Sequence, residues 1–284
     1  MLYKNLFLFI SFNCLTLCNQ SNFESAWNGE KYDKNSERQY NCGVAAIESF
    51  NLRGDEKVLD IGCGNGKITA LCAQRLPAGF LTAIDISPSM LEFAKNNYGD
   101  ANNINFLLQD VTTMNYEEEF DFVYSIFCLH WVKEPETAMH NIARALKPGG
   151  KAVLYISLPN DFNIKFKEVF GNIMNTPEWN QYKESIFYTH FPITTETWLN
   201  YAEQNNLKTN FNATCDNIVY ENYDAFKKRF TAFGLGSEIL GVMGNEIGNC
   251  FIDDCLEQFY RALGLRLNDP IVWQSDRLIL TLTK

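Results

Sequence analysis

The chain has 284 residues, of which 46% are hydrophobic, enough to build a folded core of one or two domains. Its 34 acidic residues outnumber its 24 basic residues, which gives a formal charge of −10, and no long run of Lys or Arg occurs. This composition excludes a disordered or fibrous chain. It also disfavours nucleic acid as a partner, because phosphate binding depends on clustered cations.

Nine cysteines are scattered along the chain, and no two of them form a CxxC pair. The odd number and the irregular spacing predict reduced thiols, with neither a disulfide framework nor a metal site.

The first 20 residues are an apolar segment with Lys4 near its start. The segment is too short and too polar to span a bilayer, so we expect no stable membrane span. It has the basic start and apolar centre of a secretory signal, but Leu17-Cys18-Asn19 is a poor cleavage site. An over-extended start and an apolar arm packed on the domain are the alternatives.

Between residues 57 and 157, short apolar runs alternate with stretches of helical period. The expected strands cover residues 58–61, 80–86, 104–108, 120–127 and 152–157, and the expected helices cover 67–76, 88–97 and 134–146. Lys147-Pro148-Gly149-Gly150 is typical of a turn. The alternation predicts an α/β fold, in which helices cover both faces of a doubly wound, mostly parallel sheet.

The chain after residue 160 is more irregular and more aromatic. Two weak helical stretches flank Pro177 between residues 162 and 188, and a better helix is expected at 195–205 with Thr194 or Thr195 as its cap. Strands are expected at 207–220 and 277–283, with a helical region at 223–263 that glycines interrupt. Its aromatic residues could form a lid over an acceptor site, or only the core of the cap itself.

The segment 58–66 is a buried strand that runs into a loop with glycine at positions 62, 64 and 66. Such a loop allows a tight turn and a close approach by a ligand, although a purely structural turn would also use it. A dinucleotide fingerprint needs its third glycine one residue later, where Lys67 stands. A NAD-dependent oxidoreductase is therefore disfavoured.

Three aspartates mark the ends of successive predicted strands: Asp60, Asp85 and Asp110. In a doubly wound sheet these ends form one rim, and Asp85 stands where an acid can accept both hydroxyls of a ribose. One such Asp alone is more often a cap or a turn residue. Three at successive strand ends predict a common ligand crevice.

These motifs resemble those of the class I S-adenosylmethionine-dependent methyltransferases over nearly the whole chain after residue 25. The residues that carry the resemblance are Asp60-Ile61-Gly62-Cys63-Gly64-Asn65-Gly66, Asp85-Ile86-Ser87 with Met90-Leu91, Asp110-Val111, and Leu146-Lys147-Pro148-Gly149-Gly150. The resemblance implies a seven-stranded, Rossmann-like sheet with a helical cap. The methyltransferase domain would span residues 21–284, with cap insertions at about 160–205 and 221–268.

The same resemblance implies S-adenosylmethionine as the cofactor. It assigns the following residues to the cofactor site: Gln39, Asp60, Gly62, Cys63, Gly64, Asp85, Ile86, Met90, Asp110, Val111 and Ser125.

Within this class, Trp27, Tyr32, Gln39 and the segment 129–132 resemble the subgroup of trans-aconitate and juvenile hormone acid methyltransferases, which esterify small carboxylic acids. His130 followed by Trp131 also occurs in relatives that act on malonyl carrier protein. The resemblance implies that Trp27, Tyr32 and Trp131 contact the acceptor. His130 would orient the acceptor or take a proton from it, or would only cap the following turn.

The sequence thus predicts a cytoplasmic methyltransferase for a small-molecule acceptor, most consistent with O-methylation of a carboxylate. A carboxylate is already ionised at neutral pH and needs no base, whereas a phenol or an amine would benefit from one. The alternatives are a phenol, an amine or a carrier-protein-bound acyl group as acceptor, and a module that binds the cofactor without turnover. The sequence leaves the oligomeric state open.

Overall fold

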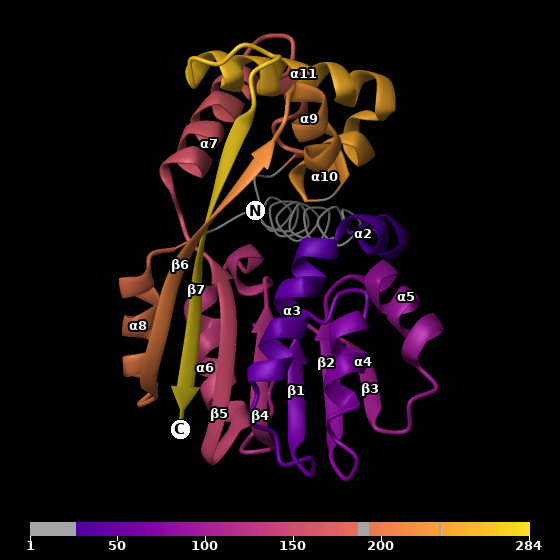
Figure 1. Cartoon of the computed structure of the whole chain (residues 1–284), viewed down its shortest axis with the longest axis vertical. Helices are drawn as coiled ribbons and strands as arrows, with labels where there is room; N and C mark the ends of the chain where they lie inside the picture. Colours follow the sequence, from indigo (N-terminus) through magenta and orange to yellow (C-terminus); the bar gives the residue numbers. More distant parts are fainter. Residues whose placement is uncertain (1–26, 187–192, 233) are drawn as a thin grey trace, which may run out of the picture.

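The computed structural model describes residues 27–186, 193–232 and 234–284, so the apolar segment at 1–20 lies outside the described residues. The described chain forms one seven-stranded sheet in the order β3-β2-β1-β4-β5-β7-β6. Helices flank the sheet, and a helical cap stands above the carboxyl ends of its parallel strands (Figure 1). The predicted fold class is confirmed.

Five strands run parallel: β1 (Lys57–Ile61), β2 (Phe80–Asp85), β3 (Ile104–Leu108), β4 (Phe120–Ile126) and β5 (Leu146–Ser157). The chain moves outward from β1 through β2 to β3 and then returns to β4 on the other side of β1. The topological switch point therefore lies between β1 and β4, where ligands bind in sheets of this kind.

Helices cover both faces of the sheet. On one face, α3 (Glu37–Ser49), α4 (Lys67–Ala73) and α5 (Pro88–Tyr98) pack against the strands. On the other face lie α6 (Pro135–Ala145) and α8 (Thr195–Gln204), whose Trp198 is fully buried. Helix α8 begins as expected, because the Thr194 hydroxyl accepts a hydrogen bond from the Thr197 N–H. It falls within the expected cap segment 160–205 but packs beside the sheet.

The prediction of a turn at residues 147–150 was wrong, because β5 begins at Leu146 and continues through them. The register between β4 and β5 shifts between Phe120 and Phe122. The Gly149 N–H donates to the Lys284 carbonyl at 3.0 Å, and the Gly150 carbonyl accepts from the Lys284 N–H at 3.1 Å. These hydrogen bonds with Lys284 hold residues 149 and 150 in the sheet, so the strand continues through the glycines.

Strands β6 (Lys208–Tyr220) and β7 (Ile271–Thr283) form a long antiparallel pair. The C-terminal part of β7 pairs with β5, while the other end of the pair rises beyond the sheet and supports the cap (Figure 1). Strand β7 begins six residues before the predicted start at residue 277, since its polar residues 274–276 are held by pairing with β6 rather than by burial.

The cap consists of α7 (Asp161–Met174), α9 (Tyr223–Ala232), α10 (Leu235–Met243), α11 (Asn245–Ala262) and the short 3-10 turn η2 (Asn180–Tyr182). Its core is largely aromatic. The predicted glycine breaks occur at Gly234 and Gly244, where φ is +62° and +77°. Gly236 and Gly248 instead lie within α10 and α11.

Two helices before β1 were not predicted: α2 (Gly29–Asn35) and α3. Helix α2 packs against α5 of the sheet and against α9 of the cap. At its start, the Gly29 N–H donates to Ser89 Oγ at 3.3 Å, and a Cβ on Gly29 would lie only 2.5 Å from Phe93 Cβ. The helix is therefore pressed closely onto α5, between the sheet and the cap.

Within the described ranges, no helix has the length and apolar character needed to cross a membrane. The same ranges hold no cluster of three or more His, Cys, Asp or Glu side chains suited to a metal ion. All seven cysteines of the described chain are free thiols.

Candidate functional site

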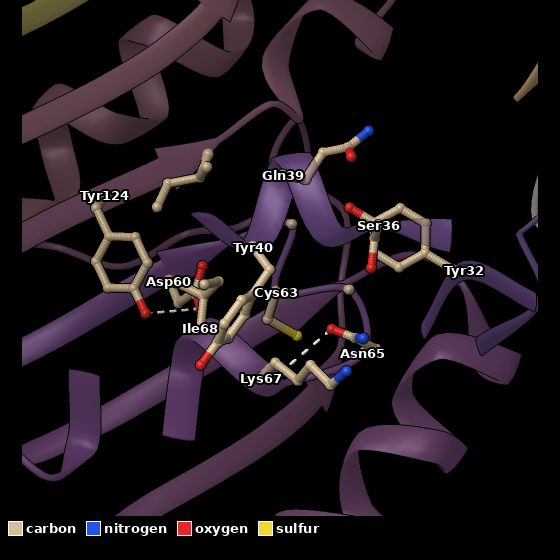
Figure 2. A pocket seen from close by; sticks show the side chains of 13 residues that line it. Tyr32, Ser36, Gln39, Tyr40, Asp60, Cys63, Asn65, Lys67, Ile68 and Tyr124 are labelled. Carbon is tan, nitrogen blue, oxygen red and sulfur yellow. Dashed lines mark hydrogen bonds between the residues drawn. The ribbon is translucent and has the colours of Figure 1, made fainter. Parts of the chain in front are cut away.

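A pocket opens at the carboxyl end of β1, at the switch point of the sheet (Figure 2). Asp60 and Tyr124 lie on one side of it and Tyr32 on the other, with Cys63 between them. The pocket is lined by five residues predicted for the cofactor site, namely Gln39, Asp60, Gly62, Cys63 and Gly64, and by Tyr32, predicted for the acceptor.

The glycine loop has a conformation that other residues would strain, because φ is +75°, +55° and +78° at Gly62, Gly64 and Gly66. A Cβ at Gly62 would lie 2.3 Å from Cys128 Sγ, and one at Gly66 would lie 2.8 Å from Ala94 Cβ. At Gly64 the nearest atom would be Tyr32 Cε1, at 4.0 Å. A larger residue would therefore clash with its neighbours at positions 62 and 66. At position 64 the absence of a side chain leaves space on the pocket side of the loop.

Asp85 ties this loop to the end of β2. Its two carboxylate oxygens accept hydrogen bonds from the Gly64 N–H at 2.8 Å and the Ser87 N–H at 2.9 Å. Burial raises the pKa of Asp85, although these backbone hydrogen bonds oppose the shift. The Ile86 N–H is a third backbone donor to this carboxylate. A carboxylate has about four acceptor sites, so roughly one remains for a further donor such as a ribose hydroxyl.

Asp60 forms the base of the pocket. Its Oδ2 atom accepts hydrogen bonds from Thr69 Oγ1 and from the Tyr124 hydroxyl, each at 2.7 Å. These bonds join β1, α4 and β4. Burial raises the pKa of Asp60 to about 7 despite both donors. Through its two hydrogen bonds, Asp60 thus holds these three elements together at the site.

The three strand-end aspartates converge on one place. Burial raises the pKa of the Cys128 thiol, and the negative charges of Asp85, Asp60 and Asp110 raise it further. All three carboxylates are therefore close enough to Cys128 for their fields to act on it. Asp110 also accepts a hydrogen bond from the Thr112 N–H at 2.7 Å, which fixes the turn after β3.

Helix α2 is fastened over the loop by Asp33. Its Oδ1 atom accepts from Asn65 Nδ2 at 2.8 Å and pairs with Lys67 Nζ at 2.7 Å. This contact brings Tyr32, the preceding residue, against Gly64. Sequence reasoning missed Asp33, because a lone acid on a short helix carries no pattern.

Gln39 of α3 projects a polar group into the same pocket. Its Oε1 atom is buried, and within the described part of the chain it has no hydrogen-bond partner. Buried acceptors are normally satisfied in folded proteins. The orphaned oxygen therefore indicates a ligand that donates a hydrogen bond here.

The other predicted cofactor residues do not line the pocket, and these include Asp85, which contacts the lining residue Gly64, and Asp110. Met90 and Val111 are each 3% exposed, and Ile86 is half-buried beside Asp85. Ser125 is fully buried and donates to the Ile61 carbonyl at 2.9 Å, which joins β4 to β1.

His130 lies in the 3-10 turn η1 (Leu129–Trp131) directly after β4. Its Nδ1 atom accepts a hydrogen bond from the Ser157 N–H at 3.2 Å, so the neutral ring carries its proton on Nε2. The next residue, Trp131, packs edge-on against Trp27, with ring centroids 5.2 Å apart. The ring of Trp27 also packs edge-on against that of Tyr32, with centroids 6.0 Å apart.

Seven further residues line the pocket that the sequence analysis did not assign to it: Ser36, Tyr40, Asn65, Lys67, Ile68, Tyr124 and Ile126. Asn65 and Lys67 belong to the glycine motif or directly follow it, so their position was the available signal. The others project from neighbouring elements that only the fold brings together.

Comparison with known proteins agrees with this geometry. Residues 59–154 match a family described as a methyltransferase domain. The chain therefore contains a methyltransferase domain over these residues.

Two relatives of this methyltransferase domain have names that state a reaction. The chain is 33% identical over 108 residues to malonyl-acyl-carrier-protein O-methyltransferase 1 of Ilyobacter polytropus, which covers 37% of this chain and 40% of that protein. It is 30% identical over 138 residues to trans-aconitate 2-methyltransferase of Shigella flexneri, covering 49% and 53%. The chain spans about half the length of the curated relatives that it matches.

Solved structures share the fold. The YcgJ protein of Bacillus subtilis aligns with a TM-score of 0.60 and 16% identity, covering 86% of this chain and 98% of that one. Phosphoethanolamine N-methyltransferase 2 of Haemonchus contortus, in complex with S-adenosyl-L-methionine, aligns with a TM-score of 0.52 and 18% identity, covering 86% and 52%.

The pocket has the chemistry to hold S-adenosyl-L-methionine, the ligand of the Haemonchus contortus structure. Asp85 offers an acceptor for a ribose hydroxyl, the orphaned Gln39 oxygen can accept from an ammonium group, and Gly64 leaves room for close approach. The surrounding carboxylates also suit a ligand that carries positive charge.

Proposed function

We propose that this protein uses S-adenosylmethionine to O-methylate the carboxylate of a small-molecule acceptor. The observation that carries the proposal is the Asp85 carboxylate, bound to the amide of Gly64 at the edge of a pocket that also holds the unsatisfied oxygen of Gln39. A hydroxyl-rich, cationic ligand meets the needs of these groups together.

In the proposed site, Asp85 accepts from a ribose hydroxyl and Gln39 accepts from the amino group of the methionine end. The glycine loop lies against that end, and Tyr32 closes the pocket from α2. When bound, S-adenosylmethionine supplies an electrophilic methyl group on a sulfonium, and loss of this methyl group leaves a neutral thioether. The protein then has to exclude water and align the acceptor atom.

The acceptor side supports a carboxylate. Because Nδ1 of His130 accepts from the Ser157 N–H, the neutral ring carries its proton on Nε2 and takes none from the acceptor there. An ionised carboxylate needs no base, which matches this tautomer better than a phenol or an amine does. Two relatives support the same acceptor chemistry, one named as a malonyl-acyl-carrier-protein O-methyltransferase and the other as a trans-aconitate 2-methyltransferase.

The test is to incubate the full chain with methyl-labelled S-adenosylmethionine and separate panels of carboxylic acids, phenols and amines. We expect labelled methyl esters and release of S-adenosylhomocysteine with one or more of the acids. Transfer only to phenols or amines would overturn the carboxylate assignment. Binding of S-adenosylhomocysteine without transfer to any panel would favour the alternative of a non-catalytic module.

We further propose that the protein works in the cytoplasm, because S-adenosylmethionine is made there. Mass spectrometry of the mature protein in fractionated cells would test this. An extracellular mature form that lacks residues 1 to about 20 would contradict it.

A further inference from the structure

We propose that Arg229 of α9 binds the carboxylate of the acceptor and makes the protein selective for anionic substrates. The inference rests on the proposed function, because it assigns a binding residue for the carboxylate of the proposed acceptor. It adds a residue of the cap that neither the sequence motifs nor the cofactor pocket includes.

The position of Arg229 follows from its effect on Tyr32. Burial raises the pKa of Tyr32 to about 12; the cation of Arg229 opposes this shift, and the carboxylate of Asp85 reinforces it. The hydroxyl of Tyr32 is thus within range of both groups. Since Tyr32 lies over Gly64 and α9 packs on α2, Arg229 stands on the cap side of this tyrosine and Asp85 on the donor side.

The start of α10 contacts the aromatic pair that is predicted to contact the acceptor. Gly234 separates α9 from α10, and a Cβ there would lie 3.3 Å from Trp131 Cη2. Trp131 in turn packs against Trp27. Because Arg229 is one turn before the end of α9, its guanidinium and the two indoles belong to the same corner between the cap and the sheet.

This corner is basic although the whole chain is acidic. Arg229 donates a hydrogen bond to the Tyr220 hydroxyl, and the charge of Arg38 also acts on Arg229. Alternate residues of a strand share a face, so Tyr220 points to the same side of β6 as Asp216. Asp216 pairs with two guanidiniums, those of Arg38 at 3.1 Å and Arg277 at 3.4 Å. Such a surplus of cations attracts an anion.

The guanidinium keeps its charge in this position. Packing lowers the pKa of Arg229 to about 10, which is still well above neutral pH. A guanidinium that has lost part of its water gains more from a carboxylate than an exposed cation does, and its fork can hold both oxygens. Lys228, the preceding residue, is exposed on the same helix and provides a matched control.

The cofactor itself offers a competing anion, because the methionine end of S-adenosylmethionine carries a carboxylate. The test must therefore separate binding of the donor from binding of the acceptor. S-adenosylhomocysteine can be titrated first by calorimetry, and acceptor probes can then be titrated into the saturated complex. Dodecanoate and trans-aconitate serve as anionic probes, and dodecanol serves as the neutral analogue of the first.

We expect Arg229→Gln to weaken binding of an anionic probe by roughly tenfold or more, while binding of S-adenosylhomocysteine and of dodecanol stays within about twofold of wild type. Arg229→Lys should restore part of the loss, because it keeps the charge without the fork. Lys228→Gln should change none of these affinities.

Three results would overturn the inference. Arg229→Gln could weaken S-adenosylhomocysteine as much as the acids, which would assign Arg229 to the cofactor. The wild-type protein could bind dodecanoate no more tightly than dodecanol and fail to bind trans-aconitate. Lys228→Gln could also weaken binding of the anionic probes as much as Arg229→Gln does. If the wild-type protein does not bind S-adenosylhomocysteine, the proposed function is contradicted. In that case a loss of acid binding in Arg229→Gln would still support the anion site.

Discussion

The sheet and the cap differ in the side chains that fill their cores. The core of the sheet is mainly aliphatic, with residues such as Leu59, Val123 and Leu280. The core of the cap is rich in rings, among them Phe162, Phe166, Trp179, Phe226, Phe251, Phe259 and Tyr260. Strand alternation and short branched side chains suit a covered sheet, whereas a small helical layer gains more buried area per residue from aromatic groups.

The two regions also present opposite charges to the space between them. The sheet contributes the carboxylates of Asp60, Asp85 and Asp110, and the cap contributes the guanidinium of Arg229. A sulfonium donor carries positive charge and a carboxylate acceptor carries negative charge. This difference fits the two proposed reactants, with the donor on the side of the sheet and the acceptor on the side of the cap.

The largest effect is expected in the cap core. Phe259 is fully buried and lies 4.8 Å from the ring of Phe162 and 5.2 Å from that of Phe166. Phe259→Ala should lower the free energy of unfolding by about 3 to 5 kcal/mol, through lost contacts and a cavity. Urea unfolding measures this change. Phe211→Ala, on the exposed face of β6, should cost less than about 0.5 kcal/mol.

The comparison of sheet and cap adds a second expectation for Phe259→Ala. The folded fraction should bind S-adenosylhomocysteine with unchanged affinity, since the donor pocket is built from the sheet and α2. Loss of this binding without a loss of stability would contradict the division of the site.

The next effect concerns donor affinity. Asp85→Ala removes an acceptor for the ribose and frees the amide of Gly64, so binding of S-adenosylhomocysteine should weaken by about 1 to 3 kcal/mol. Calorimetry gives the difference from wild type. Asp100→Asn alters an exposed acid after α5 and should leave the affinity as it is. Equal affinities for wild type and Asp85→Ala would remove Asp85 from the site.

Asp60 makes a prediction about pH. Its pKa is about 7 in the folded chain and near 3.8 when unperturbed, so between these values the folded state binds more protons than the unfolded state. Stability therefore falls as pH rises from about 4 to about 7, by on the order of 2 kcal/mol between pH 5 and pH 7. Asp60→Asn should flatten that part of the slope in urea unfolding curves. Identical slopes for the two proteins would refute the assignment.

The smallest effect is expected at the contact of α2 with the loop. Asp33→Asn weakens the attraction to Lys67 and should reduce donor affinity by about 0.3 to 1 kcal/mol, less at high salt. Glu30→Gln, an exposed change on the same helix, should have no effect. A salt-independent loss at Asp33, or an equal loss at Glu30, would argue against the role of this ion pair.

The sheet was largely predictable from sequence, because its signals are local. Four of the five parallel strands are short apolar runs, whereas β5 also includes residues 147–150. Asp60, Asp85 and Asp110 each stand at or just after the end of one of the short strands. The glycines at 62, 64 and 66 are required by positive φ or by close packing, so their spacing reports directly on the turn. Such features need no knowledge of distant contacts.

The acceptor side was less predictable, because its residues are defined by contacts that lie far apart in sequence. Helix α3 buries only Gly43, Ala46 and Ile47, which leaves almost no periodic apolar signal. Arg229 follows Lys227 and Lys228, and such a run normally indicates a solvated face. Only the packing of α9 on α2 turns this arginine toward Tyr32.

The most direct test of the account is a calorimetric titration of S-adenosylhomocysteine into the wild-type chain. The structure predicts saturable binding at one site per chain, with the protein melting at a higher temperature in the complex. No heat and no shift of the melting temperature would contradict the assignment of the pocket between β1 and β4 to this cofactor.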